Sequence, residues 1–379
     1  MSRPQRTLLA GSLALLLAAC GGESQDNSSL VAGGESPTSR SGATSAQLEA
    51  LGEAFVEARS VPEGPVYRGQ AGNARVAKAD DPANATVGSW GLVVDWPVIP
   101  IHSSLTPDGR VMTFGTTETG AQSAQLNYSV WDPELGTGPD AHLRLANGTG
   151  TDIFCGTQIL LTDGALQIFG GDVDPVPGRS TNQPNPFVTE FRSQDNSLVK
   201  VGEMNRRRWY ASSVMMPDGS VLIQGGSGGK DFPEVREPGG AFRLLTTAPT
   251  GGLAYGFPRN FLAPDGKVFG FSDSQMYRID PTGTGHIEML GTINGSNAGG
   301  DSTAALYMPG RVLQVGGGSG RASKQASIID FSGSTPVQIP LPDMAFGRHW
   351  GNATVLADGT VAVTGGSEFN NQMTGVVAY

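Results

Sequence analysis

The chain has 379 residues, of which 55 are glycine and 25 are proline, while only 16% are charged. So many helix-breaking residues exclude a largely helical fold and favour a turn-rich, all-β domain. The formal net charge of −10 at pH 7 argues against nucleic acid as a partner, because phosphate binding needs a surplus of Lys and Arg.

The first 20 residues are typical of an export signal. Arg3 and Arg6 precede an apolar run from Leu8 to Ala19, which is too short to span a membrane. The run ends in Leu17-Ala18-Ala19-Cys20, which resembles a bacterial lipobox. We therefore expect an exported lipoprotein that is anchored to the membrane of the cell envelope through a lipidated Cys20. A plain signal peptide is the alternative.

The segment from residue 21 to residue 87 has the composition of a disordered tether, being rich in Gly, Ser, Glu and Asn over its first half. Leucine and alanine at helical spacing predict one short helix within it, near residues 45–59. The globular domain is predicted to occupy residues 88–379. With Cys20 assigned to the anchor, Cys155 is the only other cysteine, so it is either an inert buried thiol or a chemically used one.

The segment from Asn205 to Ser227 predicts a β-hairpin whose two apolar strands flank Pro217-Asp218-Gly219 and whose second strand ends in a glycine pair. The pattern recurs, with turn glycines 44 to 55 residues apart. A period near ~50 residues with a glycine pair is typical of kelch repeats, which form four-stranded propeller blades. The WD40 alternative lacks its Gly-His and Trp-Asp pairs. The six turns are Asp108-Gly109, Asp163-Gly164, Asp218-Gly219, Asp265-Gly266, Pro309-Gly310 and Asp358-Gly359.

Equivalent positions of successive blades lie at equivalent places around the propeller axis. Counting eight residues back from each turn Asp, or from Pro309, gives Pro100, Cys155, Tyr210, Phe257, Asp301 and Trp350. The spacing thus predicts that Cys155 and Tyr210 are neighbours at one mouth of the channel, near Phe257.

From about Trp90 to its last residue the sequence resembles the galactose oxidase and glyoxal oxidase group of copper radical oxidases. The resemblance is carried by the motifs FCGTQILLTDG around Cys155, RWYASSVMMPDG around Tyr210, FPRNFLAPDG around Arg259 and RHWGNATVLADG around His349. It implies an all-β propeller of seven blades, six of which are recognisable here.

The resemblance also implies a site. Tyr210 would bind Cu(II) and hold a radical on a ring joined to the sulfur of Cys155, while Phe257 and Arg259 would contact the substrate. The expected reaction oxidises a small alcohol, aldehyde or carbohydrate and reduces O2 to H2O2. A solvated surface position is the alternative interpretation of Arg259.

Other parts of the family pattern have no match among the 379 residues. The family's copper site also uses a Tyr-His pair on a later hairpin and a histidine from a C-terminal domain. We therefore expect an unclosed propeller with an incomplete copper site. The tryptophan that covers the cross-linked tyrosine in galactose oxidase aligns at or near Gly228. His102, His142, His286 and His349 are not at ligand spacing, and only His349, next to Trp350, stays a weak site candidate.

Three functions remain to be distinguished. The first is a copper radical oxidase, which the Cys155 and Tyr210 register favours. The second is a non-catalytic kelch propeller that binds glycan or protein, which the missing ligands favour. The third, a propeller hydrolase of the sialidase type, would need repeated Ser-x-Asp-x-Gly-x-Thr-Trp boxes, and the sequence contains none.

Overall fold

The structure, a computed structural model, describes residues 94–117, 126–173, 182–294, 301–318 and 320–369. The described residues from Trp96 onward belong to one compact unit. The predicted signal peptide, the lipid anchor at Cys20, the tether, its helix and the domain boundary at residue 88 lie outside the described residues and stay predictions. In the described part of the chain, no helix combines the length and the hydropathy that crossing a membrane requires.

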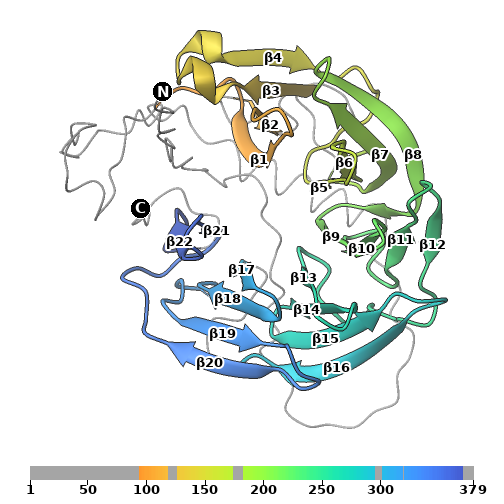
Figure 1. Cartoon of the computed structure of the whole chain (residues 1–379), viewed down its shortest axis with the longest axis vertical. Coiled ribbons are helices and arrows are strands. Elements are labelled where there is room, and N and C mark those ends of the chain that lie inside the picture. Colours follow the sequence, from red (N-terminus) through yellow and green to blue (C-terminus); the bar gives the residue numbers. More distant parts are fainter. Residues whose placement is uncertain (1–93, 118–125, 174–181, 295–300, 319, 370–379) are drawn as a thin grey trace, which may run out of the picture. The chain divides into compact units, whose positions relative to one another are not determined.

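Five four-stranded antiparallel sheets follow one another along the chain around a common axis (Figure 1). In each sheet the strand order follows the chain order, as in a propeller blade. The all-β, kelch-type propeller prediction is confirmed. The first three sheets contain β1 (Ile99–Leu105), β2 (Val111–Thr116), β3 (Asn127–Trp131) and β4 (His142–Ala146); β5 (Thr157–Leu160), β6 (Leu166–Phe169), β7 (Asn185–Arg192) and β8 (Ser197–Arg208); and β9 (Ala211–Met215), β10 (Val221–Gly225), β11 (Glu234–Arg236) and β12 (Phe242–Leu244).

The remaining strands complete the set of six repeats. Within the described ranges the sixth repeat is a two-stranded sheet, and two short 3-10 helices join β3 to β4. These elements are β13 (Arg259–Leu262), β14 (Val268–Ser272), β15 (Gln275–Asp280) and β16 (His286–Thr292); β17 (Thr303–Met308), β18 (Arg311–Val315), β19 (Ala326–Asp330) and β20 (Val337–Leu341); β21 (Asn352–Val355) and β22 (Val361–Thr364); and η2 (Pro133–Leu135) and η3 (Pro139–Ala141).

Each predicted turn joins the first two strands of a sheet. In the five Asp-Gly turns the carboxylate accepts the backbone N–H two residues further on, at 2.9 to 3.2 Å. The glycine that follows has φ between 79° and 86°, a left-handed conformation that glycine adopts without a Cβ penalty. The sequence signal therefore reports a real conformational requirement of the hairpin.

The glycine pairs lie against the segment through which the chain leaves a blade. The first glycine of a pair has a positive φ and approaches this segment closely, as a Cβ on Gly170 would come 2.1 Å from the carbonyl oxygen of Arg208, the last residue of β8 in the same sheet. The second glycine donates its N–H to the same segment. These bonds are Gly171 N to Arg208 O (3.0 Å), Gly226 N to Tyr255 O (2.8 Å) and Gly317 N to Arg348 O (2.8 Å).

The hydrophobic cores lie between neighbouring sheets. Phe114 of β2 packs in one cluster with Ile168 and Phe191 of the second sheet. Phe269 of β14 stacks on Phe331 beside the fifth sheet, with ring centroids 4.3 Å apart. Burying each such side chain stabilises the fold by roughly 1.5–3 kcal/mol, so blade-to-blade packing holds the repeats in register.

Candidate active site

We call the six residues eight positions before the turns the entry residues, and four of them share an unusual backbone. Cys155, Tyr210, Phe257 and Trp350 have φ of 59°, 70°, 48° and 56°. Left-handed conformations are rare for bulky residues and cost about 1–3 kcal/mol each. Each of these four residues lies where the chain leaves one blade and starts the inner strand of the next, and the left-handed conformation accompanies the sharp reversal of the chain there.

Backbone hydrogen bonds join entry residues of successive blades. Tyr210 donates its N–H to the carbonyl of Cys155 at 3.1 Å, and Phe257 donates to the carbonyl of Tyr210 at 2.8 Å. Trp350 donates in the same way to Asp301 at 2.9 Å. The equivalence that the sequence spacing predicted is therefore present in the geometry.

The structure brings Cys155 and Tyr210 together. They belong to one apolar cluster with Ile101, Phe154 and Trp209, against which Phe257 also packs. Cys155 is fully buried and Tyr210 is 1% exposed. The Cys155 thiol and the Tyr210 phenol are thus buried in the same cluster, and both are shielded from bulk water.

Two aromatic rings cover Tyr210. The ring of Trp209 stacks on it with centroids 3.6 Å apart, and the ring of Phe257 lies 4.6 Å away on a tilt of 38°. The aligned position Gly228 is exposed, and a Cβ there would lie 2.6 Å from the carbonyl oxygen of Arg207. The covering residue is therefore the one directly before the tyrosine.

Sequence reasoning missed Trp209 for a physical reason. Adjacent side chains of a strand point to opposite faces, so Trp209 and Tyr210 would normally not touch. The left-handed backbone of Tyr210 breaks that alternation. Two adjacent aromatic residues directly before the inner strand of a blade were the sequence feature that could have predicted this contact.

Arg259 is partly buried and does not extend into solvent. Its guanidinium donates to the carbonyl of Phe257 and to the carbonyl of Ser302 in the next blade, both at 2.6 Å. Burial lowers the pKa of Arg259 to about 10, an effect that the negative charge of Asp301 opposes. Arg259 therefore fixes the backbone of an entry residue and links the fourth blade to the fifth.

A fully buried ion pair lies just before Tyr210. Arg208 Nε donates to Glu234 Oε1 at 2.8 Å, and both side chains are 0% exposed. Burial lowers the pKa of Arg208, and the charge of Glu234 opposes that shift. Three of the other four guanidinium N–H groups donate to the carbonyls of Gly225 (2.6 Å), Gly229 (3.0 Å) and Phe232 (2.8 Å).

His349 pairs with the entry residue Asp301 through its Nδ1, and its Nε2 lies 3.0 Å from the carbonyl oxygen of Gly320. A carbonyl and a carboxylate both accept hydrogen bonds, so this environment favours the protonated form of His349. Burial by itself lowers the pKa of His349, but the hydrogen bond to Asp301 and its charge raise it above the ordinary value.

This pair predicts a pH-dependent stability. The folded-state pKa of His349 lies above the value of 6.5 of the free side chain. The pair therefore stabilises the fold fully below about pH 6.5 and loses this contribution as the pH rises through the folded pKa. Urea unfolding should show wild-type stability falling as the pH rises above about 6.5, and Asp301→Asn should reduce that fall. Replacing the exposed His286 by Gln should leave the fall unchanged; an equal effect of both changes would contradict the assignment.

The other three histidines are apart from this pair. His102 stacks on Phe114 with centroids 4.6 Å apart, and His142 lies 4.3 Å from the Trp96 ring. In the ranges that the structure describes, no three His, Cys, Asp or Glu side chains lie close enough together to hold a metal ion. A Cu(II) ion needs several N and O donors, and of the predicted set only the phenol of Tyr210 is described. The described residues therefore do not fit a complete copper site, and no chemical step is assigned to copper here.

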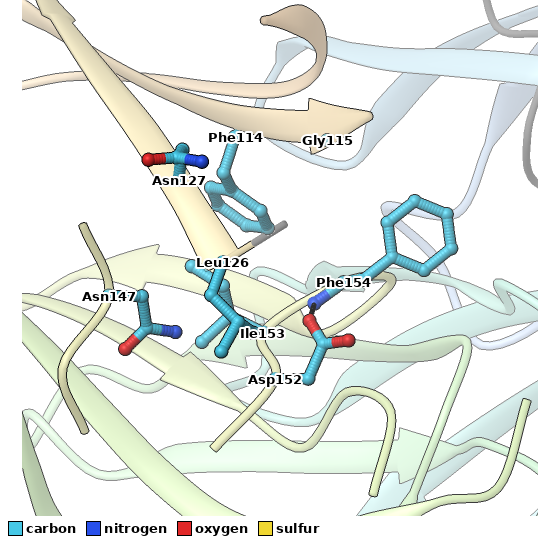
Figure 2. Close-up of a pocket in the computed structure, with 8 residues that line it drawn as sticks. All are labelled: Phe114, Gly115, Leu126, Asn127, Asn147, Asp152, Ile153 and Phe154. Carbon is cyan, nitrogen blue, oxygen red and sulfur yellow. Dashed lines mark hydrogen bonds between the residues drawn. The ribbon is translucent and has the colours of Figure 1, made fainter. Parts of the chain in front are cut away.

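A small cavity lies beside this region, between the first and second sheets (Figure 2). It has room for about one water molecule and so cannot admit a substrate. Figure 2 shows the N–H of Phe154 donating to the Asp152 carboxylate, at 2.9 Å. The bond fixes the segment that enters Cys155. The lining residues are Phe114, Gly115, Leu126, Asn127, Asn147, Asp152, Ile153 and Phe154.

The fold and these entry residues define a kelch-type propeller with a buried cysteine–tyrosine pair. No protein-family model matches the sequence. The chain is 27% identical over 344 residues to an aldehyde oxidase GLOX of Vitis pseudoreticulata, covering 78% of this chain and 62% of that protein. It is 24% identical over 315 residues to a galactose oxidase of Gibberella zeae, covering 74% and 44%.

A solved structure agrees in fold. It is a novel fungal alcohol oxidase of the AA5 family in complex with copper, with a TM-score of 0.65 and 21% identity over 75% of this chain and 62% of that one. These similarities confirm the resemblance drawn from the motifs: the chain is similar to an aldehyde oxidase GLOX and to galactose oxidase, and it shares the fold of the solved alcohol oxidase. It spans less than two thirds of the length of each of these relatives.

Proposed function

We propose that this chain supplies the tyrosine–cysteine part of a copper radical oxidase that oxidises small alcohols, aldehydes or sugars. The observation that carries the proposal is the pairing of Cys155 with Tyr210 on successive blades, through the N–H to carbonyl bond of 3.1 Å and one shared buried cluster. The oxidase names of the relatives support the same reaction class.

The chemistry requires a ring that loses an electron readily. Joining Cys155 Sγ to a ring carbon of Tyr210 removes one hydrogen from each, and O2 takes both to become H2O2. The sulfur substituent then lowers the potential of the phenol. In turnover an alcohol loses two electrons and two protons to become an aldehyde, and O2 again becomes H2O2. The rings of Trp209 and Phe257 would protect the oxidised ring from water, because they pack directly on it.

Phe257 and Arg259 are proposed to form the substrate side of this site. Phe257 offers an apolar wall next to Tyr210. Arg259 donates to the carbonyl of Phe257, so it would act partly by fixing the position of Phe257. The positive charge of the Arg259 guanidinium is suited to a polar oxygen of the substrate.

Peptide mapping tests the proposal directly. Trypsin should release Cys155 in the peptide 145–179 and Tyr210 in the peptide 209–230. After treatment with copper and O2, we expect the two peptides to be joined, with a mass about 2 Da below their sum because two hydrogens are lost. Peroxide release from glycerol, methylglyoxal and galactose measures the oxidase reaction in the same sample.

Cys155→Ser is the control, because it removes the sulfur and keeps a small polar side chain. It should abolish both the joined peptide and the peroxide. Separate peptides from the copper-treated wild type, without peroxide, would contradict the proposal and favour a kelch propeller that binds glycan or protein.

A further inference from the structure

The side chain of Asn185 lies buried between two backbone segments that lead to the candidate site. Its Nδ2 donates to the carbonyl of Asp152 at 2.9 Å and to the carbonyl of Asp172 at 2.7 Å. Its Oδ1 accepts the N–H of Phe187 at 2.9 Å, and the residue is 0% exposed. Carbonyl oxygens only accept hydrogen bonds, so these partners fix the orientation of the amide and use both of its hydrogens.

The first of the two segments leads to Cys155. Asp152, whose carbonyl Asn185 holds, lies three residues before Cys155 in the chain. The N–H of Gly156 donates to the carbonyl of Ile153 at 3.0 Å, which closes a tight turn that contains Cys155. Because only this turn separates Asp152 from the thiol, a displacement of Asp152 would also displace Cys155.

The second segment leads to Tyr210. Asn185 is paired with Arg208 in the ladder between β7 and β8. The backbone N–H of Asn185 donates to the carbonyl of Gly171 at 3.0 Å, and the N–H of Gly171 donates to the carbonyl of Arg208 at 3.0 Å. Arg208 lies two residues before Tyr210. One residue of the second blade therefore connects the segment that carries Cys155 with the segment that carries Tyr210.

We propose that Asn185 is a positioning residue that sets the placement of the Cys155 thiol relative to the Tyr210 ring. The role rests on the proposed function, because the rate at which sulfur and ring join depends on how the two groups face each other. Asn185 takes no part in the reaction and acts through Asp152 and Arg208. Its two amide donors suit it to this role, since a carboxylate or an alkyl side chain would remove both bonds to the carbonyls.

Two variants of Asn185 and one matched control test this role. Asn185→Asp puts a carboxylate oxygen against the two carbonyl oxygens, and three acceptors repel one another, so Asp152 should move. Asn185→Ala is milder, because a water molecule can take the vacated place without fixing the carbonyls. Asn260→Asp is the control. It makes the same chemical change between the third and fourth blades, where Asn260 Nδ2 donates to Gln224 Oε1 at 2.9 Å.

Hydrogen exchange of single backbone amides in the full chain without copper measures the placement. The Tyr210 N–H donates to the carbonyl of Cys155 at 3.1 Å, and it should exchange about tenfold faster in both Asn185 variants than in the wild type. The Trp350 N–H makes the equivalent bond to Asp301 at 2.9 Å and should keep its rate. An unchanged Tyr210 amide would overturn the inference. Equal acceleration of both amides would also overturn it, because it would show a general loss of stability.

The rate of cross-linking is the second measurement. Joining Cys155 Sγ to the Tyr210 ring removes one hydrogen from each residue, and O2 takes up both to become H2O2. With copper and O2 added, the joined peptide should form about 10 to 100 times more slowly in the Asn185 variants and at the wild-type rate in Asn260→Asp. A folded Asn185 variant that cross-links at the wild-type rate would overturn the inference.

The two measurements also separate this inference from the proposed function. Absence of the joined peptide from the wild type would contradict the proposed function. The exchange rates of the Tyr210 and Trp350 amides would still decide the role of Asn185, because they require neither copper nor turnover.

Discussion

Glutamine in place of Glu234 should lower the free energy of unfolding by about 3–5 kcal/mol, because it leaves the buried charge of Arg208 without its counter-ion. Glu234 Oε1 accepts from Arg208 Nε and Oε2 accepts from the N–H of Asn205, both at 2.8 Å. A carboxamide has one oxygen, so its NH2 group must face one of these two donors. Urea unfolding measures the loss.

Glu237→Gln is the matched control in the same blade. Glu237 pairs with Arg243 at 2.8 Å, but both side chains are more than one third exposed. Exposed pairs contribute about 0–1 kcal/mol, so this change should be nearly silent. Equal losses for the two variants would show that the Arg208 pair is not the buried anchor described above.

Alanine at Gly170 should cost about 2–5 kcal/mol. Its φ of 73° is left-handed, which costs a residue with a Cβ roughly 1–2 kcal/mol. The new methyl would also lie 2.1 Å from the carbonyl oxygen of Arg208, and overpacking of this kind costs about 1–3 kcal/mol. Because that carbonyl belongs to the last residue of β8, the change displaces the end of the outer strand of the same blade. Thermal and urea unfolding measure the effect.

Gly109→Ala separates the two contributions. Gly109 has a φ of 86°, and a methyl group added there would meet no atom within 4 Å, so the change carries only the conformational cost. We expect a loss of roughly 1–2 kcal/mol there. A Gly170 variant no less stable than the Gly109 variant would contradict the close approach of Gly170 to the end of β8.

The repeat signals made much of this architecture predictable. The Asp-Gly turns and glycine pairs encode local backbone conformations, which one short segment determines by itself. They fixed where each hairpin lies, and counting back from them located Cys155, Tyr210, Phe257 and Trp350. The spacing worked because no insertion separates these residues from their turns.

The contacts around the site were not predictable in the same way. Glu234 lies 26 positions after Arg208, and Asp301 meets His349 across two blades. Such pairs depend on how segments of different blades come together in the folded chain, and no local sequence pattern specifies that. Trp209 was missed because its neighbour has a backbone conformation that reverses the usual strand alternation. These residues follow from tertiary structure, whereas the turns follow from local chemistry.

The bonds between entry residues run from main chain to main chain, so the side chains are not needed to form them. Cysteine, tyrosine, phenylalanine and tryptophan all occupy equivalent places with nearly the same φ. Evolution can therefore exchange the chemistry at any one of these places without redesigning the scaffold, provided that the new residue tolerates a left-handed backbone. Asparagine, aspartate and glycine would be tolerated best at these positions because they adopt a positive φ most readily, and β-branched residues would be tolerated least. A propeller of this kind can acquire or lose a reactive pair by point mutation while its architecture persists.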